Sequence, residues 1–306
     1  MKIPEKFYLK LGNNLIVMID DEHSDRIRCN HPNTSQGKAI AFLLAGAAHC
    51  LGRSKVLTMV DKCMAPELID QGFILAGTMP GFYRGKNECS VLTYNLDDAR
   101  HRMAHPIEGA KVVDLVEQVN SVDNKHYLER RSYMEDTDLD GLDKLEISPD
   151  VQTTLAMPKD ANKIAALIDK TFFDYPTPSH DPDYIRSQIE AGVPFRFVEA
   201  DGIIVACASA DLVPDALTAE LTDCATLPEY RKRGYMMNLL TDLMWDLEQK
   251  EYYSAFTYSR ARIPGINILF KKLGFEYCGC VHQSCRIGDG LEDMNMWIRP
   301  LPNRIK

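Results

Sequence analysis

The sequence predicts an α/β (α+β) fold, and three observations support this prediction. From Val151 onwards, short apolar runs alternate with stretches whose apolar residues recur at helical spacing. Asp201-Gly202, between two apolar runs, is the strongest hairpin signal in the chain. The length of 306 residues suits two domains better than one.

The C-terminal half is expected to contain the order β-α-α-β-β-β-α-β-α-β-β. Pro158-Lys-Asp160 resembles a helix start, and Gly274 is suited to ending the last helix. The predicted segments are strand Val151–Met157, a helix through Ile164 and Phe172, helix Asp183–Glu190, strands Phe195–Glu199, Ile203–Ala210 and Ala219–Leu227, helix Gly234–Lys250, strand Tyr253–Tyr258, helix Gly265–Leu273, and strands Phe275–Val281 and Asn295–Ile298.

The N-terminal half contains a faint copy of this ending. Gly72-Phe-Ile-Leu-Ala-Gly77 matches Gly274-Phe-Glu-Tyr-Cys-Gly279, and each is followed by a strand roughly twenty residues later. The surrounding predicted segments are helix Ala39–Leu51, strand Val56–Val60, helix Ala65–Gln71 and strand Val91–Tyr94. Chance similarity between αβ units is the alternative explanation.

Three segments are therefore predicted. Residues 1–100 form an N-terminal α/β domain, interpreted as a degenerate half-copy of the C-terminal architecture. Residues 101–150 form a linker with one helix, Ala110–Val119, and an acidic run, Glu135–Asp143. Residues 151–306 form the main domain. Because Asn33-Thr-Ser-Gln-Gly37 is uncharged, the N-terminal domain is expected to be structural or a wall of the substrate site.

Composition excludes several classes of protein. The net charge of −9 disfavours nucleic acid as a partner and weakly suits a cationic small molecule. No apolar run is long enough to span a membrane, and the first residues do not resemble a signal peptide. Nine scattered cysteines then indicate reduced thiols and a cytoplasmic location. Cys278-Gly-Cys280 lacks the spacing of common zinc sites, so no metal is expected.

The most informative segment runs from Glu220 to Leu240. It reads as a strand ending at Pro228, a basic turn, and a helix opening at Gly234. The first turn of a helix has unpaired N–H groups and a partial positive charge, so it can bind a phosphate. The segment therefore predicts a site for a phosphorylated cofactor beside the end of a strand.

Arg231-x-x-Gly234-x-Met236 after this strand resembles the acetyl-CoA loop of the GCN5-related N-acetyltransferases (GNAT). The order of elements and Leu269-Phe-Lys-Lys-Leu-Gly-Phe275 also resemble that family. The resemblance implies a GNAT fold with a mixed, mostly antiparallel central sheet. It also implies acetyl-CoA as co-substrate.

Four further segments resemble the β-lysine N-acetyltransferases: Met79–Gly85, Tyr175–Tyr184, Thr222–Arg231 and Gly290–Trp297. This resemblance implies transfer of acetyl to the N6 amine of β-lysine, giving the compatible solute Nε-acetyl-β-lysine. Another small amine, a polyamine or a protein lysine remains an alternative acceptor, and a CoA-binding sensor without turnover is a second alternative. A homodimer is left open.

The GNAT resemblance assigns roles along the loop. The backbone N–H groups of the turn and first helical residues would hold the pyrophosphate, while the strand end would pair with the pantetheine arm. Asn267 is a further candidate for a pantetheine contact. The loop and strand-end candidates are Ala225, Thr226, Leu227, Arg231, Lys232, Arg233, Gly234, Tyr235, Met236 and Met237.

The chain departs from the family pattern at three positions. Lys232 and Met236 stand where the loop usually has glycines, which allow close approach to a ligand. Phe270 replaces a tyrosine that protonates the leaving thiolate in many members. Tyr258 and Tyr277 are the candidate substitutes, with simple packing as the alternative.

Acetylation of an amine needs a base, because a lysine-type amine is almost fully protonated at neutral pH. Many members of the family carry a glutamate where Glu220 stands, and Asp223 is its rival. The two are an odd number of residues apart, so they share a face only if the strand contains a bulge. Direct attack is expected, with a relay through Cys224 as the less favoured route.

The acceptor needs partners for its ammonium groups and carboxylate. Tyr175, His180 and Asp181 follow the first helix, where the family places its acceptor loop. Asp181 precedes Pro182 and is equally suited to capping a helix, and His180 to a solvated loop. Arg260 and Arg262 are candidates for binding the carboxylate.

Overall fold

The computed structural model describes residues 4–32, 34–119 and 151–302. The strands join into a single 13-stranded sheet in the order β1-β2-β3-β4-β6-β5-β12-β13-β11-β10-β9-β8-β7. Only β3–β4 and β10–β11 pair in parallel. The predicted α/β class, with a mixed and mostly antiparallel sheet, is confirmed. The predicted acidic run Glu135–Asp143 lies outside the described residues.

The C-terminal half has the predicted order of elements. The 151–157 strand is shorter than expected, since only two of its residues pair with β8. The elements are β7 (Thr154–Leu155), α5 (Ala161–Thr171), α6 (Pro182–Glu190), β8 (Phe195–Ala200), β9 (Ile203–Val213), β10 (Thr218–Thr226), α7 (Tyr235–Gln249), β11 (Ser254–Arg260), α8 (Pro264–Lys272), β12 (Glu276–Ile287) and β13 (Gly290–Pro300).

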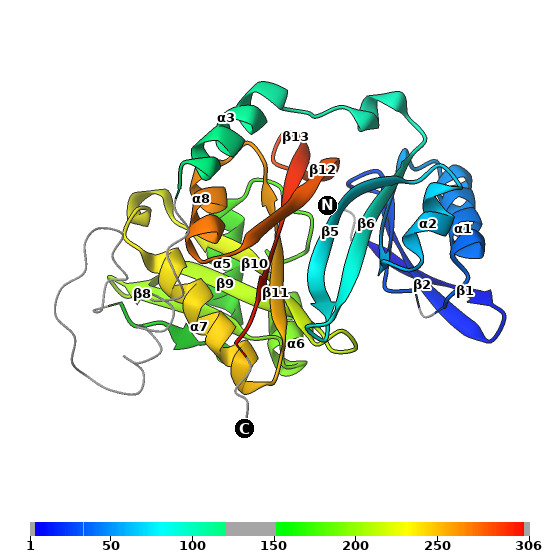
Figure 1. Cartoon of the computed structure of the whole chain (residues 1–306). Coiled ribbons are helices and arrows are strands. Elements are labelled where there is room, and N and C mark those ends of the chain that lie inside the picture. Colours follow the sequence, from blue (N-terminus) through cyan, green and yellow to red (C-terminus); the bar gives the residue numbers. More distant parts are fainter. Residues whose placement is uncertain (1–3, 33, 120–150, 303–306) are drawn as a thin grey trace.

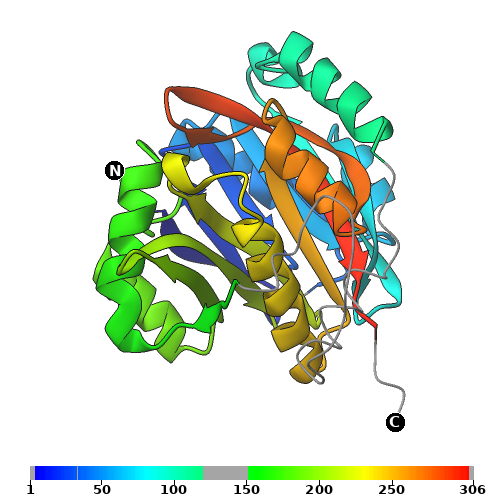
Figure 2. The same cartoon turned by 90° about the vertical axis from the view of Figure 1, so that its left-hand side faces the viewer.

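The N-terminal half begins with three strands that the sequence did not reveal. Its elements are β1 (Glu5–Leu11), β2 (Asn14–Asp21), β3 (Arg26–Asn30), α1 (Gly37–Leu51), β4 (Lys55–Asp61), α2 (Ala65–Ile69), β5 (Ile74–Tyr83) and β6 (Asn87–Asn95), followed by α3 (Pro106–Glu117). The two halves lie side by side in Figure 1 and one behind the other in Figure 2.

The two halves repeat one topology. β1-β2-β3-α1-β4-α2-β5-β6 corresponds, element by element, to β8-β9-β10-α7-β11-α8-β12-β13. The Thr58 hydroxyl donates to the carbonyl of Cys29 at 2.6 Å, and the Thr257 hydroxyl donates to that of Leu221 at 2.7 Å. Because each threonine bonds the parallel neighbour strand in the same way, β3 and β10 can be aligned residue by residue.

The halves meet where β5 pairs with β12. Gly77 lies opposite Gly279, and a β-bulge precedes each glycine in its own half. A Cβ atom on Gly77 would stand 1.9 Å from the carbonyl oxygen of Cys278, and one on Gly279 would stand 2.2 Å from that of Ala76. The matching glycines in the sequence are therefore the positions where the two backbones approach each other.

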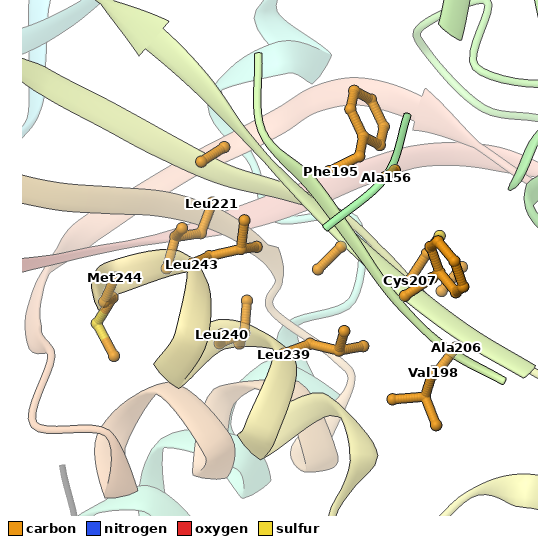
Figure 3. Packing of buried hydrophobic residues seen from close by; sticks show 14 of the residues in the cluster. Ala156, Phe195, Val198, Ala206, Cys207, Leu221, Leu239, Leu240, Leu243 and Met244 are labelled. Carbon is orange, nitrogen blue, oxygen red and sulfur yellow. The ribbon is translucent and has the colours of Figure 1, made fainter. Parts of the chain in front are cut away.

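The three largest hydrophobic clusters of the described residues hold the sheet and its helices. In the largest, leucines of α7 pack against the strands, as Figure 3 shows for Leu243 beside Leu221. A second cluster packs α1 and α2 on the N-terminal strands. The third joins the halves, with Met59 and Phe82 beside Phe256.

Two searches of the described residues gave negative results. No helix among them is long and apolar enough to cross a bilayer. No group of three or more His, Cys, Asp or Glu side chains in residues 4–32, 34–119 and 151–302 could hold a metal ion.

Candidate active site

A cavity of about 840 Å³ lies between the two halves. The N-terminal half contributes β3 and β4 through Arg26, Arg28 and Met59, among others. The C-terminal half contributes β10, β11, the basic turn before α7, and α8. The cavity is thus a joint product of both halves, and the N-terminal half forms one of its walls.

The cavity follows from a gap between β10 and β11. These parallel strands pair only from Thr218–Ser254 to Glu220–Phe256, although β10 continues to Thr226 and β11 to Arg260. Beyond Glu220 no further backbone pairing joins the two strands, and the link that follows is a side-chain one, from the Thr257 hydroxyl to the carbonyl of Leu221. Such a gap can accept an extended ligand that pairs with a strand edge.

A bulge in β10 brings both candidate bases to the cavity. The register with β9 shifts between Thr222 and Ala225, and Asp223 has a φ of +49°. The additional residue reverses the alternation of side chains, so Glu220 and Asp223 both line the cavity. Asp211 of β9, which pairs directly with Glu220 of β10, joins them there.

The three carboxyl groups have raised pKa values. Burial raises the pKa of Glu220 to about 7, and the nearby Arg28 opposes this shift. Burial, followed by the charges of Asp223 and Glu220, raises the pKa of Asp211 to about 8. Like charges in one cavity cannot all ionise independently, so the three groups titrate as a set.

Asp223 is held in place by hydroxyl groups. Its carboxylate accepts hydrogen bonds from Ser179 at 3.0 Å and from Ser209 at 2.7 Å. Burial raises its pKa, while these bonds and one from Tyr175 lower it. Tyr175 lines the cavity and stacks on Phe172 with ring centroids 4.6 Å apart. Asp223 and Tyr175 are thus fixed parts of the acidic wall.

The basic turn forms the other end of the cavity. Lys232 and Gly234 adopt φ values of +62° and +75°, so lysine occupies a left-handed position that glycine takes more readily. Arg233 lies over the ring of Tyr230 at 5.0 Å, and Arg231 donates to the carbonyl of Thr226 at 3.2 Å. The predicted residues lining the cavity here are Thr226, Arg231, Lys232, Arg233, Gly234, Tyr235, Met236 and Met237.

Three other predicted cofactor residues face away from the cavity or are already bonded. Ala225 and Leu227 are buried, and the N–H of Leu227 donates to Val205. Asn267 is fully buried, its amide nitrogen donates to two carbonyls, and its oxygen accepts from Ser259, Asn295 and Trp297. No polar atom of the Asn267 side chain is therefore free for the contact with pantetheine that was predicted for it.

The predicted acceptor residues separate into two groups. Tyr175 and Arg260 line the cavity, whereas His180, Asp181 and Arg262 do not. His180 and Asp181 are exposed, and Asp181 caps α6 by accepting from the N–H of Asp183 at 2.9 Å. The capping role for Asp181 is the one observed, and we leave His180 and Asp181 out of the site.

The two arginines predicted to bind the carboxylate already have a carboxylate partner. Arg260 and Arg262 both bond Glu292, which is 1% exposed, and Arg262 does so with two atoms within 3.0 Å. Arg262 also lies 3.7 Å from Asp289. This pairing leaves both guanidinium groups poorly suited to a second carboxylate.

Sequence reasoning missed Arg28 and Asp211. Arg28 lies on a strand that was not predicted, and Asp211 lies one residue beyond the predicted end of its strand. Their role emerges only from the tertiary structure: Asp211 on β9 pairs with Glu220 on β10, and Arg28 lies close enough to lower the pKa of Glu220. No pattern within either segment alone marks them.

The remaining candidates for proton transfer also differ in position. Phe270 lines the cavity and packs edge-on against Phe275. Tyr258 lines the cavity, with its hydroxyl 3.5 Å from the sulfur of Met59, whereas Tyr277 is not among the lining residues. Burial raises the pKa of the Cys224 thiol, and the charges of Asp223 and Glu220 raise it further. Cys224 therefore remains a thiol, which is a poor nucleophile.

Comparisons with known proteins place this cavity in a family. The profile of the acetyltransferase (GNAT) family matches residues 162–275, which include the acidic wall and the basic turn. A β-lysine N(6)-acetyltransferase of Methanosarcina mazei is 30% identical over 263 residues, covering 84% of this chain and 97% of its own length.

Two further relatives were found. The N-acetyltransferase YodP of Bacillus subtilis is 26% identical over 96% of this chain and 98% of its own length. A β-lysine N(6)-acetyltransferase of Methanococcus maripaludis is 34% identical over 47% of this chain and 53% of its own length. The chain therefore belongs to the GNAT family of N-acetyltransferases, in the group that includes the β-lysine N(6)-acetyltransferases.

Proposed function

We propose that this enzyme transfers acetyl from acetyl-CoA to the N6 amine of β-lysine. The observation that carries the proposal is the cavity itself, which has a basic helix start at one end and three carboxyl groups at the other. An acidic wall favours a cationic acceptor, and a helix N-terminus favours a phosphorylated donor. The relatives named as β-lysine acetyltransferases support the choice of amine.

The basic turn is suited to the phosphates of CoA. The first N–H groups of α7 have no partner within the helix, and Arg231, Lys232 and Arg233 add positive charge around them. The gap between β10 and β11 leads from this turn to Glu220 and can hold an extended arm. Together these features direct a thioester towards the acidic wall.

Glu220 is proposed as the base. It lies where the strands separate, and its pKa of about 7 lets it accept a proton near neutral pH. Asp223 instead accepts hydrogen bonds from two serines and Tyr175, which favours an orienting role. The acceptor ammonium would give a proton to Glu220, directly or through water, and become a nucleophile.

Direct attack is proposed rather than a relay through Cys224. The free amine forms a bond to the thioester carbon, the carbon–sulfur bond breaks, and the thiolate leaves. The nitrogen gives up its second proton as the amide forms, and this proton balances the one that the thiolate takes up to become the free thiol. Tyr258 is proposed to protonate that thiolate, since its side chain lines the cavity and Phe270 has no hydroxyl. The raised pKa of Cys224 opposes a relay, because a relay needs a thiolate.

Competition between acceptors tests the proposal. Release of free thiol from acetyl-CoA should give a higher kcat/KM for β-lysine than for lysine, spermidine or a lysine-containing peptide. Nuclear magnetic resonance of the product should place the acetyl group on N6. A higher kcat/KM for a polyamine or a peptide would overturn the choice of acceptor. Binding of acetyl-CoA without thiol release for any amine would favour a sensor instead.

A further inference from the structure

Arg28 differs from the other arginines near the acidic wall. Among the described residues its Nε is buried and donates to no acceptor; the Nε of Arg260 is also without an acceptor, but Arg260 bonds Glu292 through its Nη2. The nearest carboxylate oxygen, Oδ2 of Asp21, is 3.8 Å away and already bonds Arg26 at 2.8 Å. The Arg28 side chain is 25% exposed and lines the cavity, so its guanidinium is available to a ligand there.

The neighbouring arginines already bond carboxylates of the protein. Arg26 donates to Asp21 and also to the carbonyl and hydroxyl of Ser284, at 2.9 and 3.1 Å. Arg260 is bonded to Glu292. Of the arginines at the acidic end of the cavity, Arg28 therefore makes the fewest hydrogen bonds to the described residues.

The repeated topology explains why Arg28 stands there. Aligning the strands by the threonine hydrogen bonds to Cys29 and Leu221 places Arg28 in β3 at the position of Glu220 in β10. The ladders agree, since Arg28 pairs with Leu57 and Glu220 with Phe256. The two halves thus contribute opposite charges from equivalent positions to a single cavity.

Opposite charges at one end of a cavity match the head of an amino acid. Asp211 and Glu220 oppose each other on β9 and β10, and Arg28 acts electrostatically on both. An amino acid presents a carboxylate and an ammonium a few bonds apart at its head. A diamine or a polyamine presents only ammonium groups and would leave the arginine unpaired.

We propose that Arg28 binds the carboxylate of the acceptor and that Asp211 binds its head ammonium, leaving the distant amine to Glu220. This inference rests on the proposed acetyl transfer and specifies its substrate class: a free amino acid with a second, terminal amine. The N-terminal half thereby acts as the specificity element of an active site whose catalytic groups belong to the C-terminal half.

The test compares two acceptors that differ only in the carboxylate. They are β-lysine and the diamine that remains when β-lysine loses its carboxylate. For the wild-type enzyme, β-lysine should have the higher kcat/KM by about 100-fold, since a charge-assisted hydrogen bond contributes about 1.5–3 kcal/mol. Arg28→Gln should remove most of that preference by raising KM for β-lysine, while KM for acetyl-CoA stays unchanged.

Matched controls separate recognition from folding. Arg260→Gln replaces an arginine that is already paired with Glu292, and it should change kcat/KM for both acceptors by the same factor. Arg28→Lys should restore part of the preference, because it keeps the charge but loses the paired donors. If Arg28→Gln does not fold, the carboxamide of β-lysine tests the same contact with the unaltered enzyme, and its KM should rise by about 100-fold.

The outcomes are distinguishable from failure of the proposed function. If Arg28→Gln lowers kcat/KM equally for both acceptors, or if the carboxamide has the same KM as β-lysine, the role of Arg28 is overturned. Wild-type enzyme that turns over neither acceptor, or that prefers the diamine, would overturn the proposed acceptor whatever the variant does. A preserved preference for β-lysine in Arg28→Gln would also contradict the proposal.

Discussion

The starts of α7 and α1 are equivalent in the repeated topology but chemically different. At α7 the helix follows Gly234 and a turn of three cations, and the residues of its first turn line the cavity. At α1 the N–H of Lys38 donates to the Glu67 carboxylate at 3.0 Å, and a Cβ on Gly37 would lie 2.8 Å from the Cβ of Glu67. One helix start is open to an anion, and the other is filled by the protein's own carboxylate.

This contrast shows how a repeated fold divides labour. A carboxylate at a helix N-terminus satisfies the same N–H groups and dipole that a phosphate would. The N-terminal half therefore retains the topology without a vacant phosphate site, and it contributes Arg28 to the shared cavity instead. We infer that the halves arose by duplication and that one lost its donor site.

The largest expected effect on activity comes from replacing Glu220, the residue of β10 that is equivalent to Arg28 of β3. Glu220→Gln should lower kcat by about 10²–10⁴-fold, because it removes the proposed base. KM for acetyl-CoA should change little, as the basic turn is untouched. The measurement is steady-state thiol release at saturating substrates. A kcat within a few-fold of wild type would move the base to Asp223, which Asp223→Asn would then test.

The pH dependence of the wild-type enzyme should follow the acidic wall. Because burial raises the pKa of Glu220 to about 7, the base is protonated and inactive in acid and becomes ionised as pH rises through that value. The kcat should therefore increase with pH from about 5.5 and level off above about 8, and coupling to Asp211 should broaden the curve. A flat profile from pH 5.5 to 8 would exclude a carboxyl base of this kind.

Replacing Arg28 should shift the pH profile of kcat. Arg28 lowers the pKa of Glu220, so Arg28→Gln should move the acidic limb of kcat to higher pH. The comparison needs the diamine acceptor, which does not depend on the carboxylate contact. An acidic limb that stays in place would show that the two equivalent positions do not interact across the cavity.

The basic turn should respond more modestly. Arg231→Gln should raise KM for acetyl-CoA roughly tenfold by removing one charge near the proposed phosphate site, with kcat nearly unchanged. Inhibition constants for CoA and for pantetheine, which lacks the pyrophosphate, measured on the same variant, report whether the lost contact is to a phosphate. An unchanged KM would place the cofactor elsewhere in the cavity.

The smallest effect is expected at the filled helix start. Glu67→Ala should lower the free energy of unfolding by about 1 kcal/mol, because it removes the carboxylate that caps α1. KM for acetyl-CoA and for the acceptor should not change. Denaturant unfolding gives the first quantity and thiol release the second. A changed KM for acetyl-CoA would indicate that α1 takes part in donor binding.

The sequence predicted the C-terminal elements well because glycines, prolines and one hairpin signal mark their ends. Gly234, Gly274 and Asp201-Gly202 all stand at the turns that the structure shows. The strand β3 was missed because its charged side chains, Arg26 and Arg28, line a cavity. Local patterns record alternation, but they do not record which distant strand faces a residue.

The candidate site was predicted in part for the same reason. The loop from Arg231 to Met237 is contiguous, so its residues could be found together in the sequence. Asp211 and Arg28 come from separate strands and reach Glu220 only through strand pairing and the repeat. The bulge at Asp223 could not be predicted, because no glycine marks it in the sequence. The sequence around Asn267 likewise does not indicate that its side-chain amide is hydrogen-bonded within the core.

Calorimetric titration of the enzyme with acetyl-CoA tests the division of labour most directly. One molecule should bind per chain, with affinity lowered in Arg231→Gln and unchanged in Glu67→Ala. Two molecules per chain, or binding that is lost in Glu67→Ala and kept in Arg231→Gln, would contradict a single donor site at the start of α7.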